Sequence, residues 1–132
     1  MQEPKSVELL KLLNLINNRA TVFKKKSGLT VNALSILFVL QKDKNMMQKD
    51  IAEYIGISKA TVGIELRVLE QKGFIERTQG DQDAREMRVN IANAGLVQYG
   101  FVVRDLESRL KHVDVIPLVN ELESVFINLW KE

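Results

Sequence analysis

The 132 residues are 45% hydrophobic, 27% charged and 6% aromatic, a composition typical of one globular domain, which we expect to span 1–132. The chain has no cysteine, no apolar run near the roughly 18 residues of a membrane span and no signal-peptide pattern, so we expect a cytoplasmic protein without thiol chemistry or a membrane partner. The net charge is only +2, but residues 24–88 hold 12 Lys and Arg against 9 Asp and Glu, a weak basic excess that a solvated surface also produces.

The first predicted helix covers about 6–26. Seven of the ten residues from Val7 to Ile16 are Val, Leu or Ile, an apolar stripe too wide for packing on one side only. Ser6 is a plausible N-cap, and Ser27-Gly28 ends the helix after a run of three lysines.

The central segment predicts two short helices joined by a tight turn, after a core helix that Thr30 caps and that runs to about Gln41. Met46-Met47 forms an extended link. A short helix then covers Gln48–Ile55 and ends at Gly56. Ser58 caps the next helix, which runs to about Lys72 and ends at Gly73. Two helices joined in this way are the helix-turn-helix motif. The residues expected to face the core from the helix that Thr30 caps are Ala33, Leu34, Leu37, Phe38 and Leu40.

Two short strands, 74–77 and 88–91, are predicted around the polar tip 79–84. Such a hairpin would form a wing beside the two helices. A solvated loop explains the charged tip equally well.

The C-terminal residues predict two further helices, separated by a break at 111–114. Their apolar stripes either fold over the core or, as three such helices around a basic centre favour, form a dimer interface. The first stripe consists of Leu96, Tyr99, Val103, Leu106, Leu110 and Val113, and the second of Val115, Leu118, Leu122, Val125 and Leu129.

Nothing in the sequence indicates an enzyme, a cofactor or a metal site. His112 is the only histidine, there is no glycine-rich phosphate loop, and the carboxylates are scattered.

Three stretches resemble the MarR family of regulators, within which the Sar-type regulators are one alternative. They are QKDIAEYIGISKATV at 48–62, LEQKGFIER at 69–77, and Asp83-Ala84-Arg85 with Arg88, Val89, Ile91 and Gly95 behind it. The resemblance implies a mainly α fold with a small β-hairpin wing: a winged helix-turn-helix lobe at 30–92, with dimerisation helices at 1–28 and 93–132. It also implies a homodimer that binds an inverted repeat in double-stranded DNA, where the two recognition helices would lie about 34–36 Å apart.

The predicted DNA contacts lie on the second helix of the motif and on the wing. Thr61 and Lys59 are the expected base readers, and Ser58 either caps the helix or contacts DNA. Gly63-Ile64 replaces the Thr-Arg or Ser-Arg pair common in relatives. Base readout is then expected to be either weaker or more methyl-dependent, and Gly63 is expected to allow close approach of the helix backbone to DNA. Arg85, oriented by Asp83, resembles the arginine that enters the minor groove; a surface ion pair is the alternative. The full set of expected contacts is Lys49, Ser58, Lys59, Ala60, Thr61, Gly63, Ile64, Arg67, Arg77, Asp83, Arg85 and Arg88, with Lys42 and Lys44 as weaker candidates for phosphates.

Two functions follow. The first is a sequence-specific DNA-binding transcription regulator, a repressor that a small-molecule effector releases, since many members of the family bind small, often aromatic anions. Lys24, Lys25 and Lys26 near the expected cleft either attract such an anion or form a solvated helix end. The second is a winged-helix protein-interaction module with weak DNA binding, which the thin basic excess and Gly63-Ile64 favour.

Overall fold

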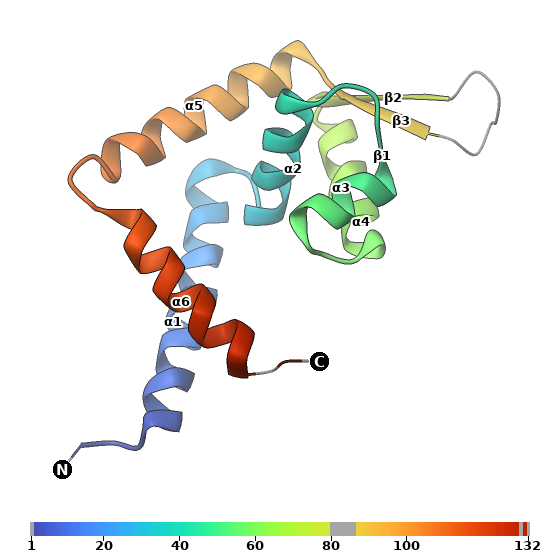
Figure 1. Ribbon diagram of the computed structural model, residues 1–132. Coiled ribbons are helices and arrows are strands. Elements are labelled where there is room, and N and C mark those ends of the chain that lie inside the picture. Colours follow the sequence, from blue (N-terminus) through green and yellow to red (C-terminus); the bar gives the residue numbers. More distant parts are fainter. Residues whose placement is uncertain (1, 80–86, 130, 132) are drawn as a thin grey trace. The chain divides into compact units, whose positions relative to one another are not determined.

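A computed structural model describes residues 2–79, 87–129 and 131 (Figure 1). The chain divides into two compact units, residues 1–99 and 100–132, and the boundary falls inside a helix. The elements in chain order are α1 (Lys5–Ser27), α2 (Val31–Lys42), β1 (Met46–Met47), α3 (Gln48–Ile55), α4 (Lys59–Gln71), β2 (Ile75–Gln79), β3 (Met87–Ile91), α5 (Asn93–Arg109) and α6 (Val115–Leu129). The mainly helical fold with a small β-hairpin is therefore confirmed.

Local capping chemistry explains most helix ends. The Thr30 hydroxyl accepts a hydrogen bond from the Ala33 amide at 2.9 Å and starts α2. Gly28 and Gly56 end α1 and α3 in the left-handed conformation that glycine adopts without strain. Ser6, however, is not a cap. It lies inside α1, whose N-cap is Pro4, because the Pro4 carbonyl already accepts hydrogen bonds from the amides of Val7 and Glu8.

The core of the first unit lies where α2, α3 and α4 meet, and the sheet covers it. Phe38 was expected in this core, but 42% of its surface is exposed. Ala33, Leu37 and Leu40 are buried as expected, and Ile36 and Val39 are buried beside them. The buried residues of these elements are Ala33, Ile36, Leu37, Val39, Leu40, Ile51, Ala52, Val62, Leu66, Leu69, Ile75 and Val89.

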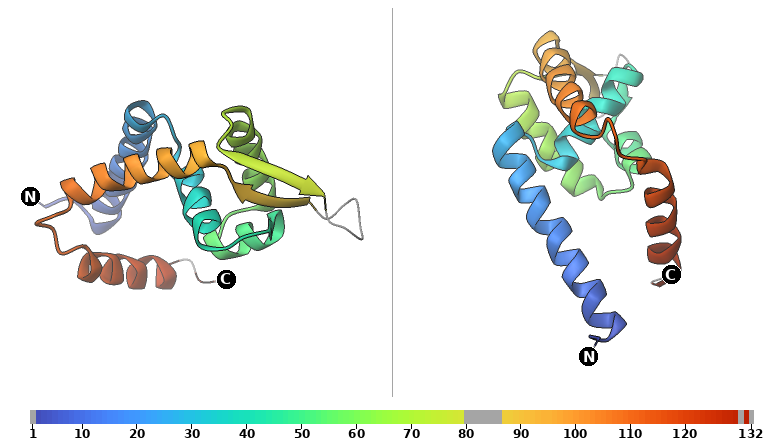
Figure 2. Two further views of the ribbon diagram at one scale, coloured as in Figure 1. Left: turned by 90° about the horizontal axis from the view of Figure 1, so that it is seen from above. Right: turned by 90° about the vertical axis from the view of Figure 1, so that its left-hand side faces the viewer.

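The sheet has the strand order β1-β3-β2, with antiparallel pairs throughout. In the hairpin, Ile75 pairs with Ile91 and Gln79 with Met87, and the two strands project from the helical lobe (Figures 1 and 2). The link at Met46-Met47 is itself a strand: Met46 pairs with Val89. This third strand anchors the hairpin to the residue that precedes α3.

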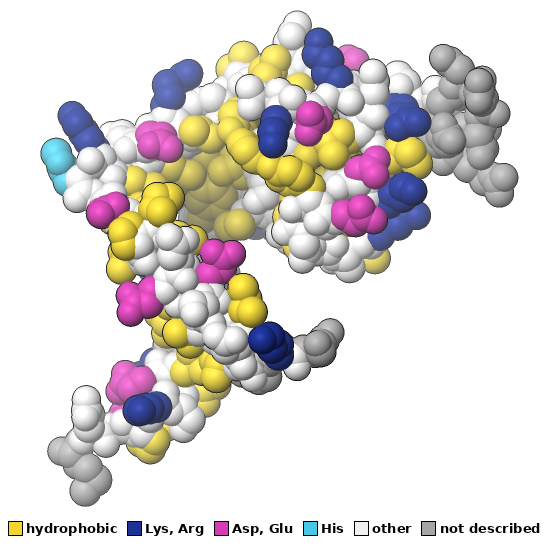
Figure 3. Space-filling view, viewed as in Figure 1, with side chains coloured by type: hydrophobic (Ala, Val, Ile, Leu, Met, Phe, Trp, Pro, Cys, Tyr) yellow, Lys and Arg dark blue, Asp and Glu magenta, His cyan; other side chains and the backbone are white. Residues whose placement is uncertain are grey.

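The second unit consists of the end of α5 followed by α6. No residue of α6 is buried, and seven of its large apolar side chains are 41–68% exposed. In Figure 3, hydrophobic side chains accordingly lie at the surface of this helix. None of the helices in the described part of the chain is long and apolar enough to cross a membrane.

Candidate nucleic-acid interface

The N-terminus of α4 is held by its own first residues. The Ser58 hydroxyl oxygen accepts a hydrogen bond from the Thr61 amide at 3.0 Å, and the same hydroxyl donates to Thr61 Oγ1 at 2.8 Å. Ser58 is therefore the helix cap, as predicted. Since backbone amides in the first turn of a helix attract anions, this end of α4 is suited to face a phosphate backbone.

Two opposite faces distinguish α4. Val62, Leu66 and Leu69 are fully buried, whereas Lys59, Ala60, Ile64 and Arg67 are exposed. Lys49 is exposed on α3. The structure thus brings four of the predicted contacts of this helix to one accessible surface, which we call the reading face: Lys59, Ala60, Ile64 and Arg67. Thr61 and Gly63 are half-buried.

Gly63 has a neighbour within the chain. A Cβ atom at this position would lie 2.8 Å from Nε2 of Gln48, and this amide donates a hydrogen bond to the Lys59 carbonyl at 2.8 Å. The missing side chain therefore makes room for a tie between α3 and α4. Sequence reasoning attributed this glycine to close approach of DNA and missed the contact with Gln48.

Arg77 faces α4 from β2. Only 18% of its side chain is exposed, and its Nε lies 3.7 Å from Oε1 of Glu70. Its Nε and one terminal nitrogen are buried without a hydrogen-bond partner among the described residues. A phosphate contact by Arg77, which the sequence suggested, would require the side chain to leave this position. Its place in the structure is a link between α4 and the wing.

A pair of asparagines ties the wing to the loop before α3. The backbone amide of Asn45 donates a hydrogen bond to Asn90 Oδ1 at 2.9 Å, and Asn90 Nδ2 donates one to the side-chain oxygen Oδ1 of Asn45, also at 2.9 Å. Asn45 adopts a left-handed φ of 57°, which asparagine tolerates better than most residues. Arg88 also donates to the Asn45 carbonyl at 3.3 Å. Sequence reasoning missed both asparagines, since no local pattern indicates a contact 45 residues apart.

The wing residues Asp83 and Arg85 lie outside the described residues, so their roles remain predictions. Among the weaker candidates, Lys42 hydrogen-bonds Tyr54 Oη at 3.2 Å and lies over its ring. The hydrogen bond to Tyr54 raises the pKa of this lysine above its usual value. On the face seen in Figure 3, basic and acidic side chains are interspersed, as the small net charge predicts.

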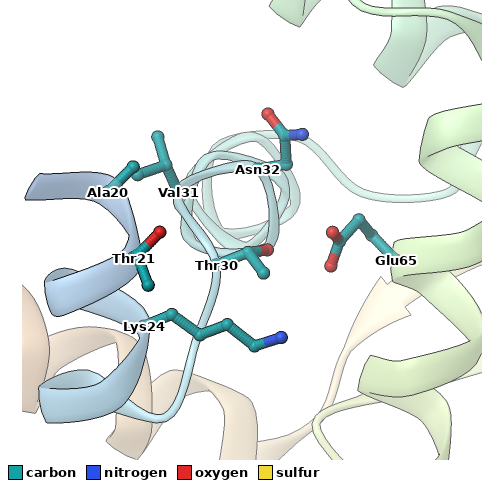
Figure 4. A pocket seen from close by; sticks show the side chains of 7 residues that line it. All are labelled: Ala20, Thr21, Lys24, Thr30, Val31, Asn32 and Glu65. Atoms are coloured by element: carbon teal, nitrogen blue, oxygen red, sulfur yellow. The ribbon is translucent and has the colours of Figure 1, made fainter. Parts of the chain in front are cut away.

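A hollow lies between the end of α1, the start of α2 and α4 (Figure 4). It consists of two adjoining spaces of about 490 and 350 Å³ that share Lys24, Thr30 and Glu65. Lys24 and Glu65 extend into it from opposite sides. The second space also borders on Ile64 and Val68, so a molecule bound there would touch the reading helix.

Among the described residues, no cluster of three or more His, Asp or Glu side chains is placed to hold a metal ion.

A capped second helix of a helix-turn-helix, followed at once by an antiparallel hairpin, defines a winged helix-turn-helix protein. Residues 29–87 match the MarR family. The chain is 30% identical over 95 residues to an uncharacterized HTH-type transcriptional regulator of Bacillus subtilis, YwoH, covering 67% of this chain and 69% of that one. The chain belongs to the MarR family, whose members are transcriptional regulators and not enzymes.

Other similarities agree with this assignment. The HTH-type transcriptional regulator SarZ of Staphylococcus epidermidis is 26% identical over 80 residues, which cover 61% of this chain and 54% of SarZ. The chain thus spans about half the length of SarZ. The PcaV transcriptional regulator of Streptomyces coelicolor, solved with its natural ligand, has the same fold, with a TM-score of 0.73 at 17% identity over 98% of this chain and 93% of PcaV.

Proposed function

We propose that this protein is a sequence-specific regulator of transcription that binds double-stranded DNA as a homodimer in the cytoplasm. The observation that carries the proposal is the reading face of α4, which is exposed above a fully buried face and begins at a capped N-terminus. A helix presented in this way fits the major groove, with its first residues at the base edges.

In this proposal, some side chains contact the bases and others contact the phosphates. Thr61 and Lys59 read bases from the first turn, while Arg67 and Lys49 contact phosphates. Arg85, oriented by Asp83, enters the minor groove. Arg88 supports the wing through its hydrogen bond to the Asn45 carbonyl, and it also contacts the DNA phosphates.

The homodimer is supported by the apolar surface that a single chain leaves exposed on α1 and α6. Burying this surface between two copies is favourable, at about 25 cal/mol per Å². The lobe at 30–92 would bind DNA, and residues 1–28 and 93–132 would dimerise. Two lobes held one DNA turn apart select an inverted repeat, and occupancy of a promoter would then repress it.

Release by a small-molecule effector is supported by the hollow beside α4. Its size suits a small molecule, and Lys24 supplies a positive charge for an anionic group. PcaV, which has the same fold, was solved with its natural ligand, and this supports a ligand site in the present chain. A ligand here would weaken DNA binding if it favoured a position of α4 that DNA does not.

The test is selection of bound duplexes from a random DNA pool, followed by affinity measurements at several salt concentrations. We expect an inverted repeat, a specificity ratio of about 10³ or more, and a log–log salt slope of about −0.9 per phosphate contacted. Arg85→Ala should lower the affinity, while Thr61→Ala should change the preferred bases.

The second candidate is a protein-interaction module, which the exposed Ile64 and Val68 on α4 favour. Weak binding that ignores sequence and responds little to salt would support it and contradict the first proposal.

A further inference from the structure

The centre of the reading face is apolar. Ile64 is 56% exposed, and Ala60 lies one turn before it on the same side of α4. A single exposed isoleucine is ordinary on a protein surface. Its position is informative here, because it lies between Lys59 and Arg67 on the surface that faces DNA in the proposed function.

The polar groups near Ile64 lie beside the centre of the face or are engaged within the protein. Thr61 is half-buried and lies outside the four residues of the reading face, and the Gln48 amide is bonded to the Lys59 carbonyl above Gly63. Ala60 and Ile64 have no side-chain donor or acceptor. A base edge that carries only polar groups would lose its hydrogen bonds to water when it packs against these two side chains, and it would gain none from the protein. This costs about 1–3 kcal/mol for each unpaired group.

One group in the major groove suits such a surface. The 5-methyl of thymine is the only apolar group that the base pairs present there. The two cationic side chains at the edges of the face complement the phosphates on either side of the groove. The occupant that fits the centre of this face is therefore a thymine-bearing segment of duplex DNA.

We infer that Ile64, together with Ala60, determines the DNA sequence specificity by contacting thymine methyl groups. This inference rests on the proposed function and deepens it. Residues four apart rise about 6 Å along the helix, and base pairs are about 3.4 Å apart, so the two side chains reach positions about two base pairs from each other. Each half-site should thus contain thymines at this spacing.

The experiment replaces single thymines of the selected operator with uracil, which removes the methyl group and keeps the hydrogen-bonding groups. Affinities are measured by fluorescence anisotropy. For the unaltered protein we expect about a fourfold loss at each contacted thymine, which corresponds to about 0.8 kcal/mol. Ile64→Ala should bind the thymine operator about as weakly as the unaltered protein binds the operator with uracil at the position that Ile64 contacts. Uracil at this position should cause no further loss for Ile64→Ala, whereas uracil at the position that Ala60 contacts should still lower its affinity.

Two variants serve as controls. Val68→Ala removes an exposed apolar side chain one turn further along α4 that, like Ile64, borders the hollow at α1. It should keep the full difference between thymine and uracil. Ile64→Val, which keeps a branched apolar side chain, should keep most of it.

The outcomes separate the two levels of the proposal. Sequence-specific binding that is equal for thymine and uracil at every position would overturn the role of Ile64 and leave the regulator intact. The same holds if Ile64→Ala retains the full discrimination. Absence of specific binding to any duplex would overturn the proposed function and this inference together.

Discussion

Gly95 and Gly63 show how the same residue type serves different needs. A Cβ atom at Gly95 would lie 2.2 Å from the backbone carbonyl oxygen of Phe74. The same oxygen accepts a hydrogen bond from the Ala92 amide. At Gly63 the nearest atom is the end of the flexible Gln48 side chain. Gly95 therefore cannot be replaced by a larger residue without a backbone shift, whereas a larger residue at Gly63 only requires the Gln48 side chain to move.

We expect Gly95→Ala to lower the free energy of unfolding by about 1–3 kcal/mol, because the backbone of Phe74 must shift. Gly63→Ala is the matched control. It should leave stability within about 1 kcal/mol, since the gain in helix propensity offsets the loss of one hydrogen bond. Urea unfolding measures both, and equal losses would contradict the distinction. Unchanged or improved DNA affinity of Gly63→Ala would also remove the predicted close approach of DNA.

The two roles of Ser58, cap and DNA contact, can be separated by charge. Ser58→Ala should cost about 1 kcal/mol of stability through loss of the cap. Ser58→Asp restores a good cap but places a negative charge near the phosphates, so stability should recover while DNA affinity falls further. Thermal unfolding and anisotropy together test this. If Asp restored the affinity too, Ser58 would act only as a cap.

At the level of elements, short ties hold the wing against the helix-turn-helix. β1 is only two residues long, so the asparagine pair beside it carries much of its attachment to β3. On the other edge of the hairpin, Arg77 approaches Glu70 on α4. The position of the wing relative to the reading helix depends on both ties.

Asn90→Ala should loosen β1 from β3, because it removes both hydrogen bonds to Asn45. Hydrogen exchange should become faster at Met46, whose neighbour on β3 is Val89. Thr78→Ala, on the opposite edge strand, is the control and should leave this exchange unchanged. Slow exchange at Met46 in Asn90→Ala would show that strand pairing alone suffices.

Arg67 and Arg77 should differ in how they affect DNA binding. Arg67 is exposed, so Arg67→Ala should reduce the salt slope by about 1, the signature of one lost phosphate contact. Arg77 is directed at Glu70, so Arg77→Ala should lower stability and leave the slope unchanged. A reduced salt slope for Arg77→Ala would instead show that Arg77 contacts a phosphate, as the sequence predicted.

On the scale of the whole molecule, α6 lacks a partner within its own unit. Leu118, Leu122, Val125 and Leu129 repeat at spacings of four, three and four, and all are exposed. This spacing is typical of helices that pack against another helix along their length. A second copy of the chain is the partner that the proposed function supplies.

Leu122→Lys should therefore dissociate the dimer and weaken operator binding, because two separate lobes no longer bind as one unit. Analytical ultracentrifugation measures the dissociation. Glu121→Lys, which changes the adjacent exposed residue, should remain dimeric. An unaltered protein that is monomeric at micromolar concentration would contradict the dimer.

Local signals were sufficient for most of the secondary structure. Caps at Thr30 and Ser58 and glycine ends at Gly56 and Gly73 act within a few residues, so the helices of the motif were predicted within about two residues. Ser6 failed as a cap because proline two residues earlier already starts the helix. Phe38 failed as a core residue because apolar character does not say which side of a helix meets a neighbour.

By itself, then, the sequence determined the helix-turn-helix, the hairpin and the residues of the reading helix, since these depend on contacts between residues close together in the chain. Only the tertiary structure decided that Arg77 faces Glu70, that Asn45 pairs with Asn90, and that Gln48 fills the space above Gly63. The last two contacts join residues 45 and 15 positions apart. Side chains so far separated meet only once α3, α4 and the sheet have packed, and no local pattern reports that packing.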